Sequence, residues 1–196
     1  ELKSMPNVTV KNRSQVFGYY DHNMLVMSER ISDHLPKTQK YLPKQRLWYI
    51  RANEVLISSG SIERPLVFGN NDTPGVMLSS AAKEYMKVYG VLVGKKPLIF
   101  TNNDSGYETA IEFKKNGVNP IILDTRSNPS SDIITEAKNL NIEIKFSYVV
   151  VAAKGYKKVK SADIAKISDD KKELFNIENI KCDCICVSGF WTPSIH

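Results

Sequence analysis

Two apolar runs with a helical stretch between them constrain the fold of this sequence more than any other feature. Residues 97–100 and 120–124 are of the kind that forms strands buried on both faces of a parallel sheet. Residues 105–116 between them are expected to form a helix that ends at Gly117. The unit is about thirty residues long, which is the size of a βαβ crossover. The sequence therefore predicts an α/β fold built on a parallel sheet.

The turn after the first of these strands bears on whether the unit can bind a dinucleotide. Such turns read G-x-G-x-x-G, because glycines let backbone amides approach the pyrophosphate at the helix N-terminus. Here Thr101 and Asn103 stand at the first two glycine positions, and only Gly106 remains. Asp104 would also repel a phosphate. Asp124 stands where an acid would hold the ribose, but it is equally a common turn residue, so we expect the fold without tight nucleotide binding.

The segments on either side of this unit extend it into a second lobe, which we expect to span residues 76–196. Residues 78–89 are expected to form a helix with Ala81, Tyr85 and Val88 on one face. After the unit we expect a helix, a strand and an antiparallel pair of strands, at residues 133–140, 142–146, 148–153 and 157–164. Together these elements predict a degenerate Rossmann-type domain.

Residues 1–75 are expected to form an incomplete first dinucleotide-binding lobe. Residues 55–58 form an apolar run that ends in Ser59 and Gly60, which predicts a buried parallel strand. A similar run precedes Ser188 and Gly189, which favours two related dinucleotide folds. No βαβ unit opens the first fold, so we expect an internal cut from a larger protein. Earlier apolar runs predict a β-meander with strands at residues 8–10, 16–20, 24–27 and 47–50, interrupted by a polar excursion at residues 28–45.

A candidate cofactor site belongs to this first lobe. In two-dinucleotide architectures the adenine end of the cofactor lies against backbone of the β-meander, and the last strand's Ser-Gly turn passes near the pyrophosphate. The candidate cofactor-binding residues are therefore Gln15, Val16, Ser58, Ser59 and Gly60. An ordinary strand and turn explain the same residues equally well, and the sequence leaves both interpretations open.

Other chemistry-bearing residues suggest no catalytic or metal site. The histidines at 22, 34 and 196 lack metal-ligand partners at i+2 or i+4, and we expect no metal and no catalytic acid, base or nucleophile. Cys182, Cys184 and Cys186 alternate along a strand, so we expect them on one face as buried, reduced thiols.

Charge and hydropathy exclude two classes of partner. The net charge of +6 comes from lysines spread along the chain, whereas nucleic-acid footprints cluster, so we expect no nucleic-acid partner. No apolar run approaches the roughly 18 residues needed to cross a bilayer. We therefore expect a cytoplasmic protein without a membrane partner.

Four collinear stretches together resemble one known family. They are residues 17–23 (FGYYDHN), 62–78 (IERPLVFGNNDTPGVML), 100–107 (FTNNDSGY) and 182–193 (CDCICVSGFWTP). In this order they resemble the α subunit of heterotetrameric sarcosine oxidase across nearly the whole chain. The resemblance implies a two-dinucleotide-domain fold like that of FAD/NAD-linked disulfide reductases, with the first lobe incomplete.

The resemblance also implies an activity and a set of cofactors. The complex would oxidatively demethylate sarcosine to glycine, pass the one-carbon unit to tetrahydrofolate and form hydrogen peroxide. NAD would lie in the first lobe of the intact α subunit with Val16 at its adenine end, FAD and FMN elsewhere in the complex, and folate outside this chain. Partners would be the β, γ and δ subunits. A subunit of a related amino-acid or opine dehydrogenase, or a non-catalytic docking scaffold, are the alternatives.

Overall fold

The chain forms two compact units in the computed structural model, which describes residues 2–37 and 40–195. The units are Glu1–Ser58 and Ser59–His196. Residues 59–75, which the sequence analysis placed with the first lobe, lie in the second unit. The prediction for His196 falls outside the described residues, as do two positions of the polar excursion, 38 and 39.

The first unit is an antiparallel sheet in the order β1-β2-β3, made of β1 (Ser14–Tyr20), β2 (Met24–Arg30) and β3 (Gln45–Arg51), preceded by a short 3-10 helix, η1 (Leu2–Ser4). The β1–β2 turn is tight because His22 and Asn23 adopt positive φ angles of 59° and 53°. Val26 and Met27 are its only buried hydrophobic residues among those described, so little apolar surface holds this sheet within its own unit.

Two strand predictions for the first unit are wrong. Residues 8–10 pair with no strand among those described, and residues 55–58 form an extended, exposed segment. Leu56 is 93% exposed. An apolar run becomes a buried strand only where neighbouring strands pair with it, and no described strand pairs with either segment. The predicted strands at 16–20, 24–27 and 47–50 are confirmed.

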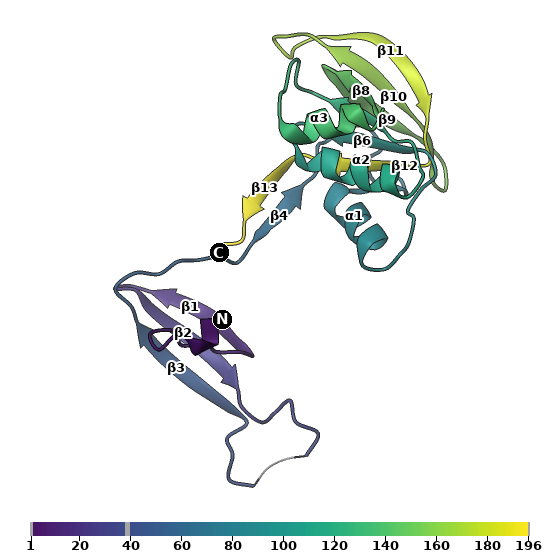
Figure 1. Ribbon diagram of the computed structural model, residues 1–196. Coiled ribbons are helices and arrows are strands. Elements are labelled where there is room, and N and C mark those ends of the chain that lie inside the picture. Colours follow the sequence, from purple (N-terminus) through teal and green to yellow (C-terminus); the bar gives the residue numbers. More distant parts are fainter. Residues whose placement is uncertain (1, 38–39, 196) are drawn as a thin grey trace. The chain divides into compact units, whose positions relative to one another are not determined.

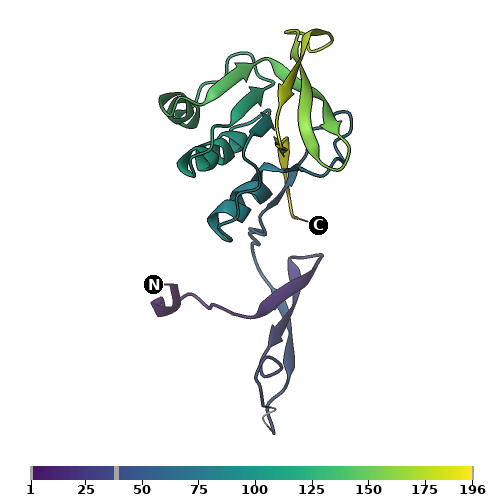
Figure 2. The same cartoon turned by 90° about the vertical axis from the view of Figure 1, so that its right-hand side faces the viewer.

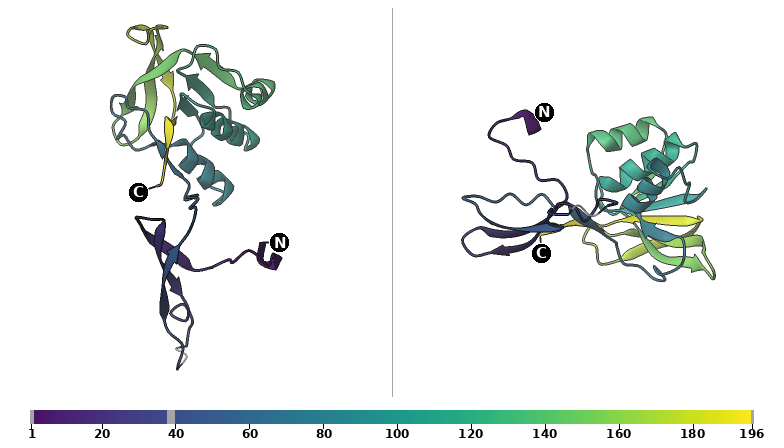
Figure 3. Two further views of the ribbon diagram at one scale, coloured as in Figure 1. Left: turned by 90° about the vertical axis from the view of Figure 1, so that its left-hand side faces the viewer. Right: turned by 90° about the horizontal axis from the view of Figure 1, so that it is seen from below.

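The second unit is built on a parallel sheet in the order β5-β12-β6-β7-β8. Its strands are β5 (Val76–Leu78), β6 (Pro97–Thr101), β7 (Ile121–Asp124), β8 (Glu143–Phe146) and β12 (Cys184–Ser188). Three helices cover one face of this sheet: α1 (Ser79–Lys87), α2 (Ser105–Lys115) and α3 (Asp132–Asn139). An antiparallel sheet covers the other, made of β9 (Tyr148–Gly155), β10 (Val159–Ile167) and β11 (Leu174–Lys181). Figure 2 and Figure 3 show these three layers.

The central strands are apolar on both faces because each face has its own core. On β6, Ile99 packs into the core under the helices, while Leu98 and Phe100 pack into the core under the antiparallel sheet. This explains why β6 and β12 read as continuous apolar runs, and it confirms the predicted α/β class.

Two details of the second unit correct the sequence analysis. The face of α1 that packs on the sheet carries Ala82 and Met86, whereas Tyr85 and Val88 of the predicted face are 46% and 66% exposed. Cys184 and Cys186 lie on the helix side, but Cys182 precedes β12 and packs on the other side. A bend at Asp183 breaks the strand alternation there. All three cysteines are free and buried, as predicted.

A two-stranded antiparallel ribbon completes the second unit. Its strands are β4 (Ser61–Arg64) and β13 (Phe190–Pro193), with Phe190 opposite Arg64 and Pro193 opposite Ser61. The chain enters the second unit along β4 and returns along β13 directly after β12 (Figure 1).

Candidate functional site

The carboxyl ends of three parallel strands bring the candidate residues of the second unit together. Thr101 at the end of β6 lies opposite Ser188 of β12 on one side and opposite Asp124 of β7 on the other. Strand order reverses around β6, because the next strand in the chain, β7, lies on one side and β12 on the other. Open α/β sheets bind nucleotides in the crevice at such a point. The turn from Thr101 to Gly106 is therefore where a dinucleotide would lie.

Thr101 fills the space that the first fingerprint glycine leaves open. Its side chain is fully buried, and its hydroxyl oxygen accepts a hydrogen bond from the Asn103 amide at 3.1 Å and donates one to the Asn103 carbonyl at 2.8 Å. A Cβ on Gly106 would lie 2.6 Å from the Cβ of Thr101. The third glycine of the pattern is retained because helix α2 packs directly against Thr101.

The side chain of Asn103 occupies one of the backbone amides that a phosphate would use. Its carboxamide oxygen accepts a hydrogen bond from the Ser105 amide at 2.9 Å, at the N-terminus of α2. Its amide nitrogen donates to the carbonyl oxygens of Gly189 at 2.5 Å and Ser188 at 3.3 Å. A helix N-terminus binds anions through its free amides, and here the turn's own side chain takes one of them.

Asp124 is held by protein groups rather than left free for a ribose. It is fully buried and accepts hydrogen bonds from the Tyr107 hydroxyl at 2.7 Å and from the Arg126 amide at 2.9 Å. The Arg126 guanidinium adds a forked contact, Nε to Oδ1 at 3.0 Å and Nη2 to Oδ2 at 2.8 Å. Arg126 Nη1 also forms an ion pair with Asp104 at 2.9 Å. A carboxylate has about four acceptor positions, so Asp124 has none to offer a ligand.

The electrostatics of this cluster favour the closed arrangement. Burial opposes the charge on Arg126, but its hydrogen bonds to Asp124 and Asp104 outweigh that effect and place its pKa above the ordinary value. Burial, followed by the hydrogen bond to Asp124, raises the pKa of Tyr107, so the phenol keeps the proton that it donates. The cluster is therefore a structural network of fixed charge, and Asn103 and Asp124 have no free group to offer a dinucleotide at this turn.

The predicted cofactor residues fall into both units. Gln15 and Val16 lie on β1, where Val16 is half exposed and a register shift between Val16 and Gly18 interrupts the pairing with β2. Ser58 lies in the exposed segment that ends the first unit. In the second unit, the Ser59 hydroxyl donates to the Ser194 carbonyl, and Gly60 has a φ of +81°. Ser59 and Gly60 thus lie together beside the ribbon, where the Ser194 amide donates to the Gly60 carbonyl at 2.9 Å.

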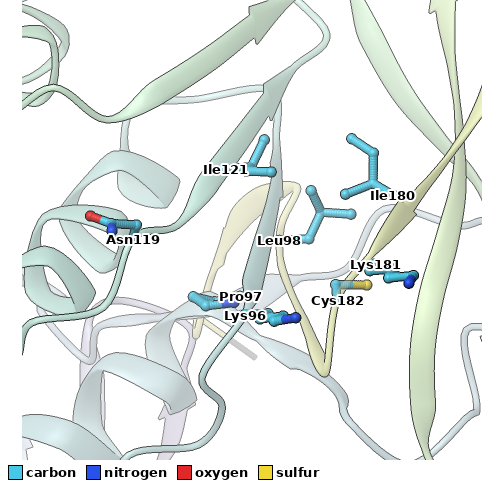
Figure 4. Close-up of a pocket in the computed structure, with 8 residues that line it drawn as sticks. All are labelled: Lys96, Pro97, Leu98, Asn119, Ile121, Ile180, Lys181 and Cys182. Carbon is cyan, nitrogen blue, oxygen red and sulfur yellow. The ribbon is translucent and has the colours of Figure 1, made fainter.

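A small cavity of the second unit lies at the other end of the parallel sheet from the turn between Thr101 and Gly106 (Figure 4). It has a volume of about 170 Å³ and lies between the starts of β6 and β7 and the end of β11, lined by residues that include Leu98, Ile121 and Ile180. Ligand pockets usually measure about 300–1,000 Å³, so this cavity is too small for a dinucleotide. Among the described residues, no group of three or more His, Cys, Asp or Glu side chains could hold a metal ion.

Thr101, Asn103, Asp104 and Asp124 stand out in the sequence, whereas their partners Tyr107 and Arg126 were not predicted from it. A signal was present, since a carboxylate at the buried end of a parallel strand requires hydrogen-bond donors nearby. Arg126 stands two residues after Asp124, and Tyr107 lies in the first turn of α2.

No described helix is both long and apolar enough to cross a membrane.

Comparison with known proteins shows similarity along the whole chain. The sarcosine oxidase α subunit of Rhizobium meliloti (strain 1021) is 38% identical over 197 residues, and that of Corynebacterium sp. (strain P-1) is 31% identical over 199 residues. Each match covers 100% of this chain but only 19% and 20% of those subunits, respectively, so the chain spans about a fifth of their length. No family model matches the chain.

Solved structures with a similar fold include disulfide reductases. Thioredoxin reductase of T. acidophilum gives a TM-score of 0.59 at 17% identity, covering 76% of this chain and 49% of that one. The flavoprotein disulfide reductase RclA of Escherichia coli gives 0.56 at 17% identity, covering 99% and 39%. The predicted disulfide-reductase-like fold is confirmed.

Proposed function

This chain is a homologue of the sarcosine oxidase α subunit along its whole length, and we propose that it forms part of such a subunit and contributes scaffold rather than catalytic groups. The observation that carries the scaffold role is the closed turn of the second unit, where Asn103 occupies the α2 N-terminus and Arg126 saturates Asp124. The comparisons do not favour the amino-acid or opine dehydrogenase subunit that the sequence left as an alternative.

The proposed activity belongs to the assembled complex. It would oxidise sarcosine to glycine with oxygen as acceptor, releasing hydrogen peroxide and passing the one-carbon unit to tetrahydrofolate. FAD and FMN would supply the redox chemistry, and the β, γ and δ subunits would be its partners in the cytoplasm. The names of the curated relatives and the collinear stretches quoted above support this proposal. The 196-residue chain alone would be inactive.

We place NAD in the first lobe of the intact subunit, with Gln15 and Val16 at the adenine end and Ser58, Ser59 and Gly60 near the pyrophosphate. The half-exposed Val16 beside a break in strand pairing supports this assignment, because it leaves backbone and side chain accessible to a ring. The first sixty residues contain only Gly18 and Gly60, so this chain carries no glycine-rich turn of its own for that lobe.

Titration calorimetry of the 196-residue chain with NAD tests the scaffold role. We expect no binding in the micromolar range, because the first sixty residues carry no glycine-rich turn and Asn103 closes the corresponding turn of the second unit. Micromolar binding by the wild-type chain that persists in Val16→Asp, a change confined to the first unit, would assign the site to the second unit and refute the scaffold role.

A segment exchange tests membership of the complex. Residues 1–196 would replace the matching segment of the Rhizobium meliloti α subunit, which would be expressed with its partner subunits. Assembly with sarcosine-dependent peroxide formation supports the proposal. Assembly with activity only toward proline or opines and an artificial electron acceptor under anaerobic conditions would contradict it.

A further inference from the structure

Two residues of the turn between Thr101 and Gly106 also bond to β13 and to the residues directly before it. Asn103 donates to the carbonyls of Ser188, the last residue of β12, and of Gly189, which connects β12 to β13. The Trp191 indole nitrogen of β13 donates to the Ser105 hydroxyl at 2.8 Å. Ser188, Gly189 and Trp191 are thus bonded to two residues of one turn, Asn103 and Ser105.

The other strand of the ribbon is fastened separately. Glu63 of β4 is only 3% exposed, and its carboxylate accepts a hydrogen bond from the Ser80 amide at 2.8 Å, in the first turn of α1. The Gly189 amide donates to the Arg64 carbonyl at 2.8 Å, and a Cβ on Gly189 would lie 2.6 Å from that same oxygen. Both strands therefore contact the body of the second unit where the ribbon begins.

We propose that this turn has become a brace, in which Asn103 and Ser105 lock the β4–β13 ribbon to the parallel sheet so that the ribbon cannot swing about Gly189. A turn with glycine at position 103 has no carboxamide to reach the Gly189 carbonyl. The residue that stands at the second fingerprint-glycine position, Asn103, is thus the same residue that supplies the brace. The ribbon carries the chain into the second unit, so the brace fixes the direction in which the chain enters it.

Hydrogen–deuterium exchange of the 196-residue chain tests the brace. Asn103→Ala removes the carboxamide, and Trp191→Phe removes the indole donor while keeping an aromatic ring. Each lost hydrogen bond is expected to accelerate exchange in residues 59–66 and 188–194 about five- to tenfold, and the double variant by more. Exchange in β6 and β7 should stay unchanged. Asn116→Ala is the matched control, because Asn116 caps the other end of α2 and touches no part of the ribbon.

Three outcomes would overturn the brace. They are unchanged ribbon exchange in the double variant, acceleration confined to the first turn of α2, and equal acceleration throughout β6 and β7. If Asn103→Ala fails to fold, Ser105→Ala and Trp191→Phe remove the same contact from its two sides. They should then accelerate ribbon exchange equally and not additively. Additive effects, or no effect of either, would equally refute the brace.

Discussion

Tyr107→Phe isolates the contribution of the Asp124 network to stability. The ring of Tyr107 is fully buried and packs in the core under the helices, so phenylalanine keeps its packing and removes only the hydroxyl. That hydroxyl donates to Asp124 at 2.7 Å. A hydrogen bond to a charged group contributes about 1.5–3 kcal/mol. Because Arg126 still holds both oxygens of Asp124, we expect a loss near the lower end, about 2 kcal/mol.

Urea unfolding followed by far-UV circular dichroism measures this loss, because all three described α-helices lie in the second unit. Tyr156→Phe is the control, since Tyr156 is 91% exposed and its hydroxyl makes no hydrogen bond among the described residues. A double-mutant cycle with Asp124→Asn should give a coupling of roughly 1–2 kcal/mol. Additive single effects, or a loss below about 0.5 kcal/mol for Tyr107→Phe, would refute the network as a source of stability.

Three further predictions concern other parts of the chain. Gly106→Ala forces a Cβ against Thr101 and should cost about 1–3 kcal/mol, part of which Thr101→Gly should restore in the urea assay; no restoration would place the strain elsewhere. Burial, followed by Cys184 and Asp183, raises the pKa of Cys182 from 9.0 to about 12, so its contribution is intact below the unfolded pKa and is lost as pH rises toward the folded one. The unfolding free energy of the wild type should therefore fall relative to that of Cys182→Ala as pH rises from about 9 toward about 12, and a constant difference would contradict this. The hydrogen bond from the Trp48 indole lowers the pKa of Glu29 below 4.5, so Trp48→Phe should raise that pKa in an NMR titration. The stability that this contact gives is present above about pH 4.5 and is lost as pH falls through the lowered pKa.

The central strands were predictable because burial on both faces leaves a local signature. The run at β6 is apolar at successive positions, since Leu98 and Ile99 face different cores. The ribbon was not predictable, because β4 pairs with β13 across more than a hundred residues of sequence and neither strand is apolar throughout. The exposed run at 55–58 shows the converse, since its apolar residues have no described strand to pair with.

The absence of the fingerprint glycines could be predicted from the sequence, but the side-chain contacts of the candidate site could not. Missing glycines can be read from the chain at Thr101 and Asn103. The contact from Asn103 to Gly189 depends on β12 lying beside β6, two strands that are far apart in the sequence and meet only in the folded sheet. The Tyr107 contact to Asp124 depends in the same way on the packing of α2 over β7.

Restoring the glycine pattern alone should not restore nucleotide binding. Glycines at 101 and 103 would free the amide at the start of α2, but Asp124 would remain saturated by Tyr107 and Arg126, and the ribose would find no acceptor. The same two glycines would remove the contacts from Asn103 to the ribbon, and each new glycine would add backbone entropy to the unfolded chain. The chain would therefore lose stability before it gained a ligand. The closed turn is therefore a stable alternative to a nucleotide-binding turn, because Asn103 and Asp124 bond to other parts of the protein.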